Sequence, residues 1–251
     1  MKPDVIIAGG GLAGMVTALE LLDQGLRVCL LDRDEPAKLG GLAQWSLGGL
    51  FYVNSPLQRR RGIRDSVDLA LADWLAVAEF GPYDEWPRRW AEAYVSECTE
   101  QVYAWLRPYG IKYVPFPLHQ ERRAGDEPGN SVPRFHLVWG AGKGLTDTLG
   151  AALKTQRHID RLELRFRHRV ARICSNSVGQ ITGVAGVDET NGEPFEVDAS
   201  VVVIASGGIT GNADLLRRHW YKPWGTPPPV ILNGDRKSTR LNSSHESISR
   251  M

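Results

Sequence analysis

Three glycines near the start of the sequence, Gly9, Gly11 and Gly14, are spaced as G-x-G-x-x-G and directly follow the β-branched run Asp4–Ala8. In such a turn the first glycine allows a tight bend, and the second lets a pyrophosphate approach the backbone. The third lets the following helix pack closely on the strand. The N-terminus of that helix offers free N–H groups and the positive end of its dipole to phosphates. The pattern therefore predicts a dinucleotide-binding turn.

A carboxylate follows at the end of the next apolar run. Leu12–Gln24 has apolar residues at helical spacing, and Arg27–Leu31 has the composition of a second strand, which ends at Asp32. A strand–helix–strand opening of this length makes the two strands parallel neighbours. We therefore expect Asp32 beside the glycine turn, where it can accept hydrogen bonds from an adenosine ribose. An accidental glycine turn would not explain Asp32.

Two later segments extend the prediction. Residues 39–49 (LGGLAQWSLGG) are rich in glycine, and Ala205-Ser206-Gly207-Gly208 ends the apolar run that begins at Val201. A nicotinamide cofactor has no evident need for the first segment, whereas a flavin needs backbone against its ribityl chain and ring edge, with Gln44 or Ser46 as hydrogen-bonding partners. A flexible loop is the plainer alternative. The second segment can reach the same ligand, because ligands of parallel sheets bind at the carboxyl ends of strands.

The remaining sequence supplies the elements that position these turns. Helical patterns at 66–79 and 87–107 indicate a helical insertion at about 56–125. Segments at 165–173, 181–187 and 195–197 alternate with Gly and Asn turns, which predicts an antiparallel β-meander. The expected fold class is α/β. It is a Rossmann-like FAD/NAD(P)-binding domain over residues 1–234, with a central parallel sheet, the meander and the helical insertion.

Residues 235–251 differ in character from the rest of the chain. This segment, DRKSTRLNSSHESISRM, has few apolar residues. Its first eleven residues resemble the translation of a common short-read sequencing adapter, so we interpret 235–251 as a non-native tail. A disordered serine-rich tail is the alternative.

Composition excludes several classes of protein. The 251 residues contain 30 basic and 29 acidic side chains, a balance that argues against a nucleic-acid-binding protein. No apolar run approaches the roughly 18 residues of a transmembrane helix, and the start lacks a secretory signal. Cys29, Cys98 and Cys174 are scattered, so they fit neither a disulfide framework nor a metal site. A cytoplasmic location is expected.

Together the glycine turns and the meander resemble the flavoproteins that include fumarate reductase and succinate dehydrogenase flavoprotein subunits, L-aspartate oxidase and 3-ketosteroid Δ1-dehydrogenase. The bacterial FAD-binding dehydrogenases are the most similar group, through GGLAQWSLGGLF, QRRRGIRDS, WPRRWAEAYV, GNSVPRFHLVWG and VVIASGGITGN. The resemblance implies FAD, bound noncovalently because the second glycine loop has no histidine. It implies these contacts: Gly9, Gly11 and Gly14 at the pyrophosphate; Asp32 at the adenosine ribose; Gly40, Gly41, Gln44, Ser46, Gly48 and Gly49 at the flavin; Val170, through its backbone, at the adenine; Ala205, Gly207 and Gly208 at the adenosine end.

Arg134 and His136 are the candidate catalytic residues, because they alternate on one side of a short predicted strand and can both face a cleft. Arginine stays charged and histidine titrates near neutrality, so the pair could bind a substrate and carry protons. The alternative is a structural arginine and a histidine whose hydrogen bonds are satisfied within the fold.

The resemblance implies an FAD-dependent oxidoreductase that moves a hydride between a substrate carbon and flavin N5, at a CH–CH bond near a carbonyl group of a small molecule. An NAD(P)-dependent reductase and a truncated, non-catalytic dinucleotide-binding protein are the alternatives. Family members continue into a capping domain and a last FAD-binding segment, which this sequence lacks, so the fragment is expected to be inactive. The choice among steroid, enoyl acid and dicarboxylate substrates, the electron acceptor and the oligomeric state stay open.

Overall fold

The computed structural model describes residues 2–119 and 125–231, and the proposed tail at 235–251 lies outside them. The chain forms two compact units. The first consists of Met1–Trp45 and Leu149–Met251, and the second of Ser46–Thr148.

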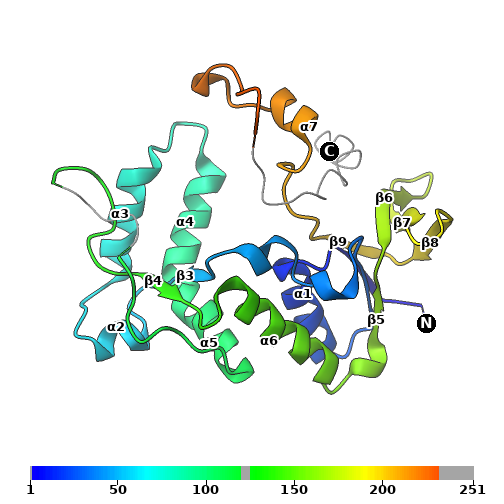
Figure 1. Ribbon diagram of the computed structural model, residues 1–251, viewed down its shortest axis with the longest axis horizontal. Helices are drawn as coiled ribbons and strands as arrows, with labels where there is room; N and C mark the ends of the chain where they lie inside the picture. The colour runs from blue at the N-terminus through cyan, green and yellow to red at the C-terminus, as the bar shows by residue number, and fades with distance from the viewer. Residues whose placement is uncertain (1, 120–124, 232–251) are drawn as a thin grey trace. The chain divides into compact units, whose positions relative to one another are not determined.

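The first unit is built on a four-stranded parallel sheet (Figure 1). Its strands are β1 (Val5–Ala8), β2 (Val28–Leu31), β5 (Leu162–Arg165) and β9 (Val201–Ile204), in the order β5-β2-β1-β9. Helix α1 (Leu12–Asp23) connects β1 to β2, and the two strands are parallel neighbours. The predicted strand–helix–strand opening and the central parallel sheet are confirmed.

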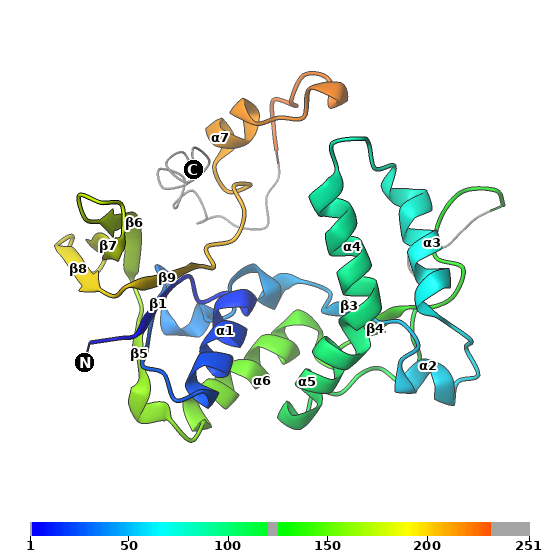
Figure 2. The same ribbon diagram turned by 180° about the vertical axis from the view of Figure 1, so that it is seen from behind.

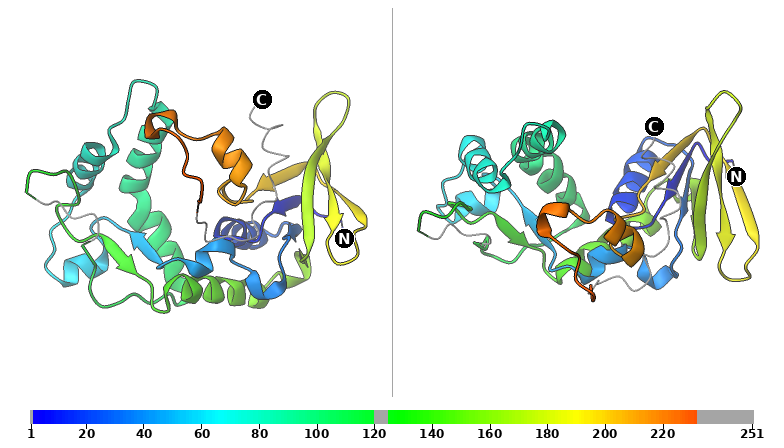
Figure 3. Two further views of the ribbon diagram at one scale, coloured as in Figure 1. Left: turned by 45° about the horizontal axis from the view of Figure 1, so that its top comes forward. Right: turned by 90° about the horizontal axis from the view of Figure 1, so that it is seen from above.

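A separate antiparallel sheet follows in the same unit. Strands β6 (His168–Ser175), β7 (Ile181–Asp188) and β8 (Pro194–Asp198) pair in sequence order, which confirms the predicted meander (Figure 3). The register shifts between Val170 and Arg172, so β6 carries an irregularity of the β-bulge type early in the strand.

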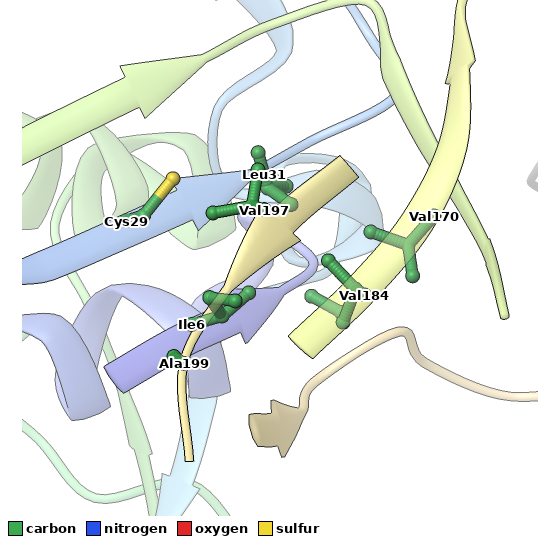
Figure 4. Packing of buried hydrophobic residues seen from close by; sticks show 8 residues of the cluster. Ile6, Cys29, Leu31, Val170, Val184, Val197 and Ala199 are labelled. Carbon is green, nitrogen blue, oxygen red and sulfur yellow. The ribbon is translucent and has the colours of Figure 1, made fainter. Parts of the chain in front are cut away.

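Side chains on one face of the parallel sheet pack against the meander. Ile6 and Leu31 contact the cluster that includes Val184 and Val197, and all four side chains are buried (Figure 4). Successive residues of a strand point to opposite faces, so Ile7 lies on the other face, where α1 packs. The sheet is therefore covered on both faces, which explains why its central strands are uniformly apolar.

The prediction of one strand over residues 165–173 was wrong at its start. β5 ends at Arg165 as a member of the parallel sheet, and β6 begins at His168 in the meander. Between them Arg167 has a φ of +60°, a left-handed conformation that breaks a strand. Because charged and apolar residues alternate through both segments, with no Gly, Pro or Asn between them, the pattern alone did not separate them.

The second unit combines helices with a short antiparallel pair, β3 (Gly49–Phe51) and β4 (Phe135–Leu137). Helices α3 (Val67–Ala78) and α4 (Glu85–Glu97) lie side by side (Figure 2). Ser66 caps α3 by accepting a hydrogen bond from the Leu69 N–H. Their inner faces close over a core that also contains aromatic side chains; its buried members are Tyr52, Val53, Ala70, Val95 and Cys98.

The remaining elements are short or connect these. Helix α2 spans Pro56–Arg60, a π-helical turn spans Cys98–Tyr103, and α5 spans Ala104–Leu106. Helix α6 (Ala141–Thr155) runs across the boundary of the two units in sequence, and α7 spans Ala213–Arg218. Short 3-10 turns occupy Pro36–Lys38, Gly41–Trp45, Arg107–Tyr109, Ile159–Arg161 and Lys222–Trp224. Among the described residues, no helix combines the length and the apolar character that crossing a membrane requires.

Candidate functional site

The three glycines of the first turn differ in what surrounds them. Atoms of the chain fill the Cβ positions of Gly9 and Gly14, whereas the Cβ position of Gly11 is empty. Gly9 has a φ of +115°, and a Cβ atom there would overlap the backbone carbonyl of Ala205. A Cβ atom at Gly14 would overlap the carbonyl oxygen of Gly9. At Gly11 no atom lies within 4 Å of the Cβ position. Packing therefore explains the first and third glycines, while Gly11 leaves free space at the N-terminus of α1, where a phosphate group can approach.

Asp32 joins β2 to this turn. One carboxylate oxygen accepts a hydrogen bond from the Gly10 N–H at 2.6 Å, and the other accepts one from the Asp34 N–H at 2.6 Å. Burial raises the pKa of Asp32, and these two hydrogen bonds oppose that rise. Each carboxylate oxygen can accept more than one hydrogen bond. Asp32 can thus fix the glycine turn and still accept a hydroxyl donor from a ligand.

Asp32 and the glycine turn line one cavity in the first unit. Its wall is formed by the ends of β1 and β2, the start of β6 and the turn after β9. The predicted contacts in the wall are Gly9, Gly11, Asp32, Gly41, Val170, Ala205, Gly207 and Gly208. Gly207 and Gly208 resemble Gly11, because no atom lies within 4 Å of their Cβ positions. The cavity brings together residues that are up to two hundred positions apart in the sequence.

Part of this wall was not predicted from the sequence. Arg33, Asp34, His168 and Arg169 also line the cavity. Their neighbours Asp32 and Val170 were predicted, so adjacency in sequence was the one available signal. Val170 itself packs its side chain into the buried cluster, which leaves its backbone toward the cavity wall.

The first half of the second glycine segment folds against the first turn. The Gly40 N–H donates to the carbonyl oxygen of Gly10 at 2.7 Å, and Gly11 and Gly40 form a parallel bridge. Gly41 has a φ of +56° and lines the cavity. The Gln44 side chain donates to the Leu39 carbonyl oxygen at 2.7 Å. Residues 39–44 therefore form an ordered part of the site in the first unit.

The second half of the segment belongs to the second unit. The Gly48 N–H donates to the Ser46 hydroxyl oxygen at 3.2 Å. A Cβ atom at Gly48 would overlap the backbone of Ala141, and one at Gly49 would overlap the ring of Phe135. Local packing alone explains both glycines, so their contact with a flavin stays a prediction.

Arg134 lies within a buried ionic network of the second unit. Its guanidinium group donates through Nε and Nη2 to Asp65, at 2.8–3.1 Å, and through Nη1 to Asp73 at 2.6 Å and to Asn130 at 2.9 Å. Burial alone would lower the pKa of Arg134, but the hydrogen bonds and charges of Asp65 and Asp73 outweigh it and raise that pKa. The arginine therefore connects the start of α3 with the strand β4.

His136 is fully buried between two oxygen atoms. Its Nδ1 lies 2.7 Å from the Arg134 carbonyl oxygen, and its Nε2 lies 2.7 Å from the Ser55 hydroxyl oxygen. A carbonyl can only accept, so Nδ1 carries the proton and the Ser55 hydroxyl donates to Nε2. Burial lowers the pKa of His136, so the ring is neutral near pH 7. These contacts favour the structural interpretation of both candidate catalytic residues.

The second unit also contains an apolar cavity of about 570 Å³. Phe51, Trp74, Val77 and Phe135 are among the residues that line it, and Asp73 supplies a carboxylate. A volume of this size and a mainly apolar wall with few polar groups are typical of small-molecule sites.

Comparison with known proteins decides the family. The family described as the FAD binding domain matches residues 4–250. The chain belongs to this FAD-binding family. The family match confirms FAD, the cofactor expected from the glycine turns. The relatives confirm the resemblance to the fumarate reductase and steroid dehydrogenase flavoproteins.

Relatives in the FAD-binding family include steroid dehydrogenases. A KsdD-like steroid dehydrogenase of Mycobacterium tuberculosis is 46% identical in an alignment that covers 93% of this chain and 44% of the relative. A KsdD-like steroid dehydrogenase of Mycolicibacterium smegmatis is 43% identical, and the alignment covers 92% of this chain and 44% of the relative. The chain thus spans less than half the length of these curated relatives.

Solved structures share the fold. The crystal structure of 3-ketosteroid-Δ4-(5α)-dehydrogenase from Rhodococcus jostii superimposes with a TM-score of 0.73 at 21% identity, over 92% of this chain and 51% of that one. A flavocytochrome c3 fumarate reductase gives 0.71 at 24% identity, over 89% of this chain and 36% of that one. These two likenesses confirm the predicted α/β fold class.

Proposed function

We propose that this chain is the FAD-binding part of a dehydrogenase that removes two hydrogens from a CH–CH bond next to the carbonyl group of a steroid. When bound, FAD supplies the hydride-accepting flavin N5, and a proton leaves the adjacent carbon. The family and the two steroid dehydrogenases at 46% and 43% identity support this assignment. The observation that carries it is the single cavity that joins the open Gly11, the carboxylate of Asp32 and the turn after β9.

The chain's own residues would bind the adenosine and diphosphate parts of the cofactor. The N–H groups at the start of α1 point a positive dipole end at the pyrophosphate, and Gly11 gives it room to approach. Asp32 would accept a ribose hydroxyl, and Val170 would meet the adenine through its backbone. The turn at Ala205, Gly207 and Gly208 would close the adenosine end.

We also propose contacts with the flavin, on two different grounds. Gly40 is joined to the glycine turn by a backbone hydrogen bond, Gly41 lines the same cavity, and the Gln44 side chain donates to the Leu39 carbonyl oxygen. These contacts support a role for the three residues next to the ribityl chain. The residues Ser46, Gly48 and Gly49 of the second unit are proposed partners of the flavin ring on the family resemblance.

Arg134 and His136 enter this proposal as positioning residues and not as proton carriers. Their donors and acceptors are engaged with Asp65, Asp73 and Ser55 inside the second unit. A buried arginine paired with two carboxylates stays charged and cannot release a proton. The pair would stabilise the strand β4 beside the apolar cavity, whose wall includes Phe135.

The apolar cavity supports an apolar substrate. Its aromatic and aliphatic wall suits the ring body of a steroid better than a dicarboxylate, because a dicarboxylate needs several cationic partners and the cavity offers the carboxylate of Asp73 instead. A small-molecule substrate in the reducing cytoplasm is proposed. The free cysteines Cys29, Cys98 and Cys174 support that location.

The division into a domain at 1–234 and a non-native tail at 235–251 is proposed as well. The test is to sequence the source DNA across the codon for Gly234 with unrelated primers. A reading frame that continues into a longer protein supports the adapter origin of the tail, and a genome that encodes DRKSTRLNSSHESISRM followed by a stop codon overturns it.

The activity is tested with the protein from the complete reading frame. The purified protein should carry flavin absorbance, and a 3-ketosteroid should bleach that absorbance under anaerobic conditions. A protein that binds FAD but is reduced by no steroid, enoyl acid or dicarboxylate would favour the non-catalytic dinucleotide-binding alternative. A protein without flavin that binds NADPH would favour the NAD(P)-dependent reductase.

A further inference from the structure

A bridge of three charged side chains lies at the rim of the cofactor cavity. Glu189, in the turn between β7 and β8, accepts a hydrogen bond from the Arg33 Nε at 2.6 Å through one carboxylate oxygen. Its other oxygen accepts from the Arg169 Nε at 3.2 Å. Arg33 follows β2, and Arg169 is in β6. The bridge therefore connects three segments that are distant in sequence.

Both arginines line the cavity, whereas Glu189 does not. The side chains are 22%, 29% and 26% exposed for Arg33, Arg169 and Glu189, so solvent screens this bridge less than a surface pair. Arg33 is adjacent to Asp32, and Arg169 is adjacent to Val170, which are the residues proposed for the ribose and the adenine. The bridge is thus next to the adenosine end of the cavity.

The backbone around the bridge is held by separate hydrogen bonds. The His168 N–H donates to the Asp32 carbonyl oxygen at 2.9 Å, and the Glu189 N–H donates to the Arg167 carbonyl oxygen at 2.7 Å. These bonds do not involve the Glu189 carboxylate. Removing that carboxylate should therefore take away its two hydrogen bonds to the guanidinium groups without unfolding the strands that carry them.

We propose that Glu189 is a positioning residue that fixes Arg33 and Arg169 at the adenosine end of the cavity, and that this bridge makes the site select flavins that carry adenosine. A fixed guanidinium plane can stack on a flat adenine ring or donate to its nitrogen atoms. Without the carboxylate between them, the two positive groups repel each other and lose this orientation. The inference rests on the proposed binding of FAD in this cavity.

The test compares three ligands on the protein from the complete reading frame and on its variants. FAD and ADP both carry adenosine, whereas FMN carries the flavin without it. We expect Glu189→Gln to weaken FAD and ADP binding by about tenfold and to leave FMN binding within about twofold. The matched control is Glu196→Gln, because Glu196 is in the same meander and pairs with Arg172 at the surface, with both side chains more than 60% exposed. The control should bind all three ligands as the unaltered chain does.

Two further variants distinguish positioning from folding. Glu189→Asp keeps the charge but shortens the side chain, and it should reproduce part of the loss. Arg33→Gln should weaken FAD binding, and its effect should not add to that of Glu189→Gln, because both changes break one bridge. Thermal unfolding of each variant shows whether the fold is intact.

The outcomes separate this inference from the proposed function. If the unaltered chain binds FAD and Glu189→Gln binds FAD and ADP within twofold of it, the bridge has no such role. An equal loss for FAD, ADP and FMN would mean a general structural effect and would also overturn the inference. If the unaltered protein from the complete reading frame binds neither FAD nor ADP, the proposed function fails, and the inference fails with it.

Discussion

Alanine substitutions at Gly11 and Gly14 should have opposite consequences, although the two glycines belong to one motif. A methyl group at Gly14 overlaps the carbonyl oxygen of Gly9, which is backbone and cannot rotate away. Overpacking of this kind costs about 1–3 kcal/mol, and a clash with backbone belongs at the upper end. For a chain of this size, that corresponds to a melting temperature lower by roughly 6–12 °C. Gly14→Ala should therefore lose stability first and FAD binding as a consequence.

The Gly11→Ala variant should be as stable as the unaltered chain but should bind FAD more weakly. Gly11 has a φ of −69° and a ψ of −176°, which alanine adopts without strain, and no atom lies within 4 Å of the new methyl group. Stability should change by less than about 1 kcal/mol. The methyl group instead occupies the space through which the pyrophosphate approaches the α1 N-terminus. Losing one or two charge-assisted hydrogen bonds, at about 1.5–3 kcal/mol each, lowers FAD affinity at least tenfold.

The assay is FAD titration by fluorescence quenching, alongside thermal unfolding without ligand. Gly150→Ala is the control, because Gly150 is inside α6 and its Cβ position makes an ordinary 3.6 Å contact with Leu39. That variant should bind FAD normally and gain up to about 1 kcal/mol of stability. If Gly11→Ala bound FAD within threefold of the unaltered chain, the assignment of the open space at Gly11 to the pyrophosphate would be refuted.

Three further predictions concern the buried polar groups. Arg134→Gln should lower the free energy of unfolding by about 3–5 kcal/mol in urea titrations, because it leaves two buried carboxylates without their cation, whereas the exposed Arg172→Gln should cost less than about 1 kcal/mol. The lowered pKa of His136 means that the unfolded chain binds more protons. Stability should therefore fall as pH drops below about 6.5, by up to about 1.4 kcal/mol per pH unit, and His136→Gln should flatten that slope. Burial raises the pKa of the Cys29 thiol to about 11, so iodoacetamide at pH 8 should label Cys174 first by mass spectrometry.

The elements around the first glycine turn could be predicted because their signals are local. Apolar runs, a glycine stop after α1 and Asp32 at the end of β2 occur within the first 32 residues. The antiparallel meander was predictable for the same reason, since short turns connect its strands. β5 was not predictable, because its separation from β6 depends on the left-handed conformation of Arg167. Arginine has no preference for that conformation, so the residue type gives no signal of it.

The surroundings of Arg134 could not be read from the sequence. Its carboxylate partners Asp65 and Asp73 are 69 and 61 positions away. An arginine and a histidine two residues apart have the same pattern whether they face a cleft or a buried network. The difference lies in burial and in the partners, and tertiary packing determines both.

A glycine motif, too, has the same sequence pattern whether its glycines serve the fold or a ligand. The surroundings of each glycine distinguish the two roles at most positions of the site. A glycine is required because its backbone has a positive φ, because a neighbouring atom fills the Cβ position, or because a ligand must approach the backbone. Gly9, Gly14, Gly48 and Gly49 belong to the first kind, since atoms of the chain itself fill their Cβ positions. Gly11, Gly207 and Gly208 have empty Cβ positions, and all three line one cavity. Gly207 also has a φ of +77°, which favours glycine by itself. Gly11 and Gly208 are thus the cavity glycines that neither packing nor a positive φ explains, and we propose that the dinucleotide approaches the backbone there.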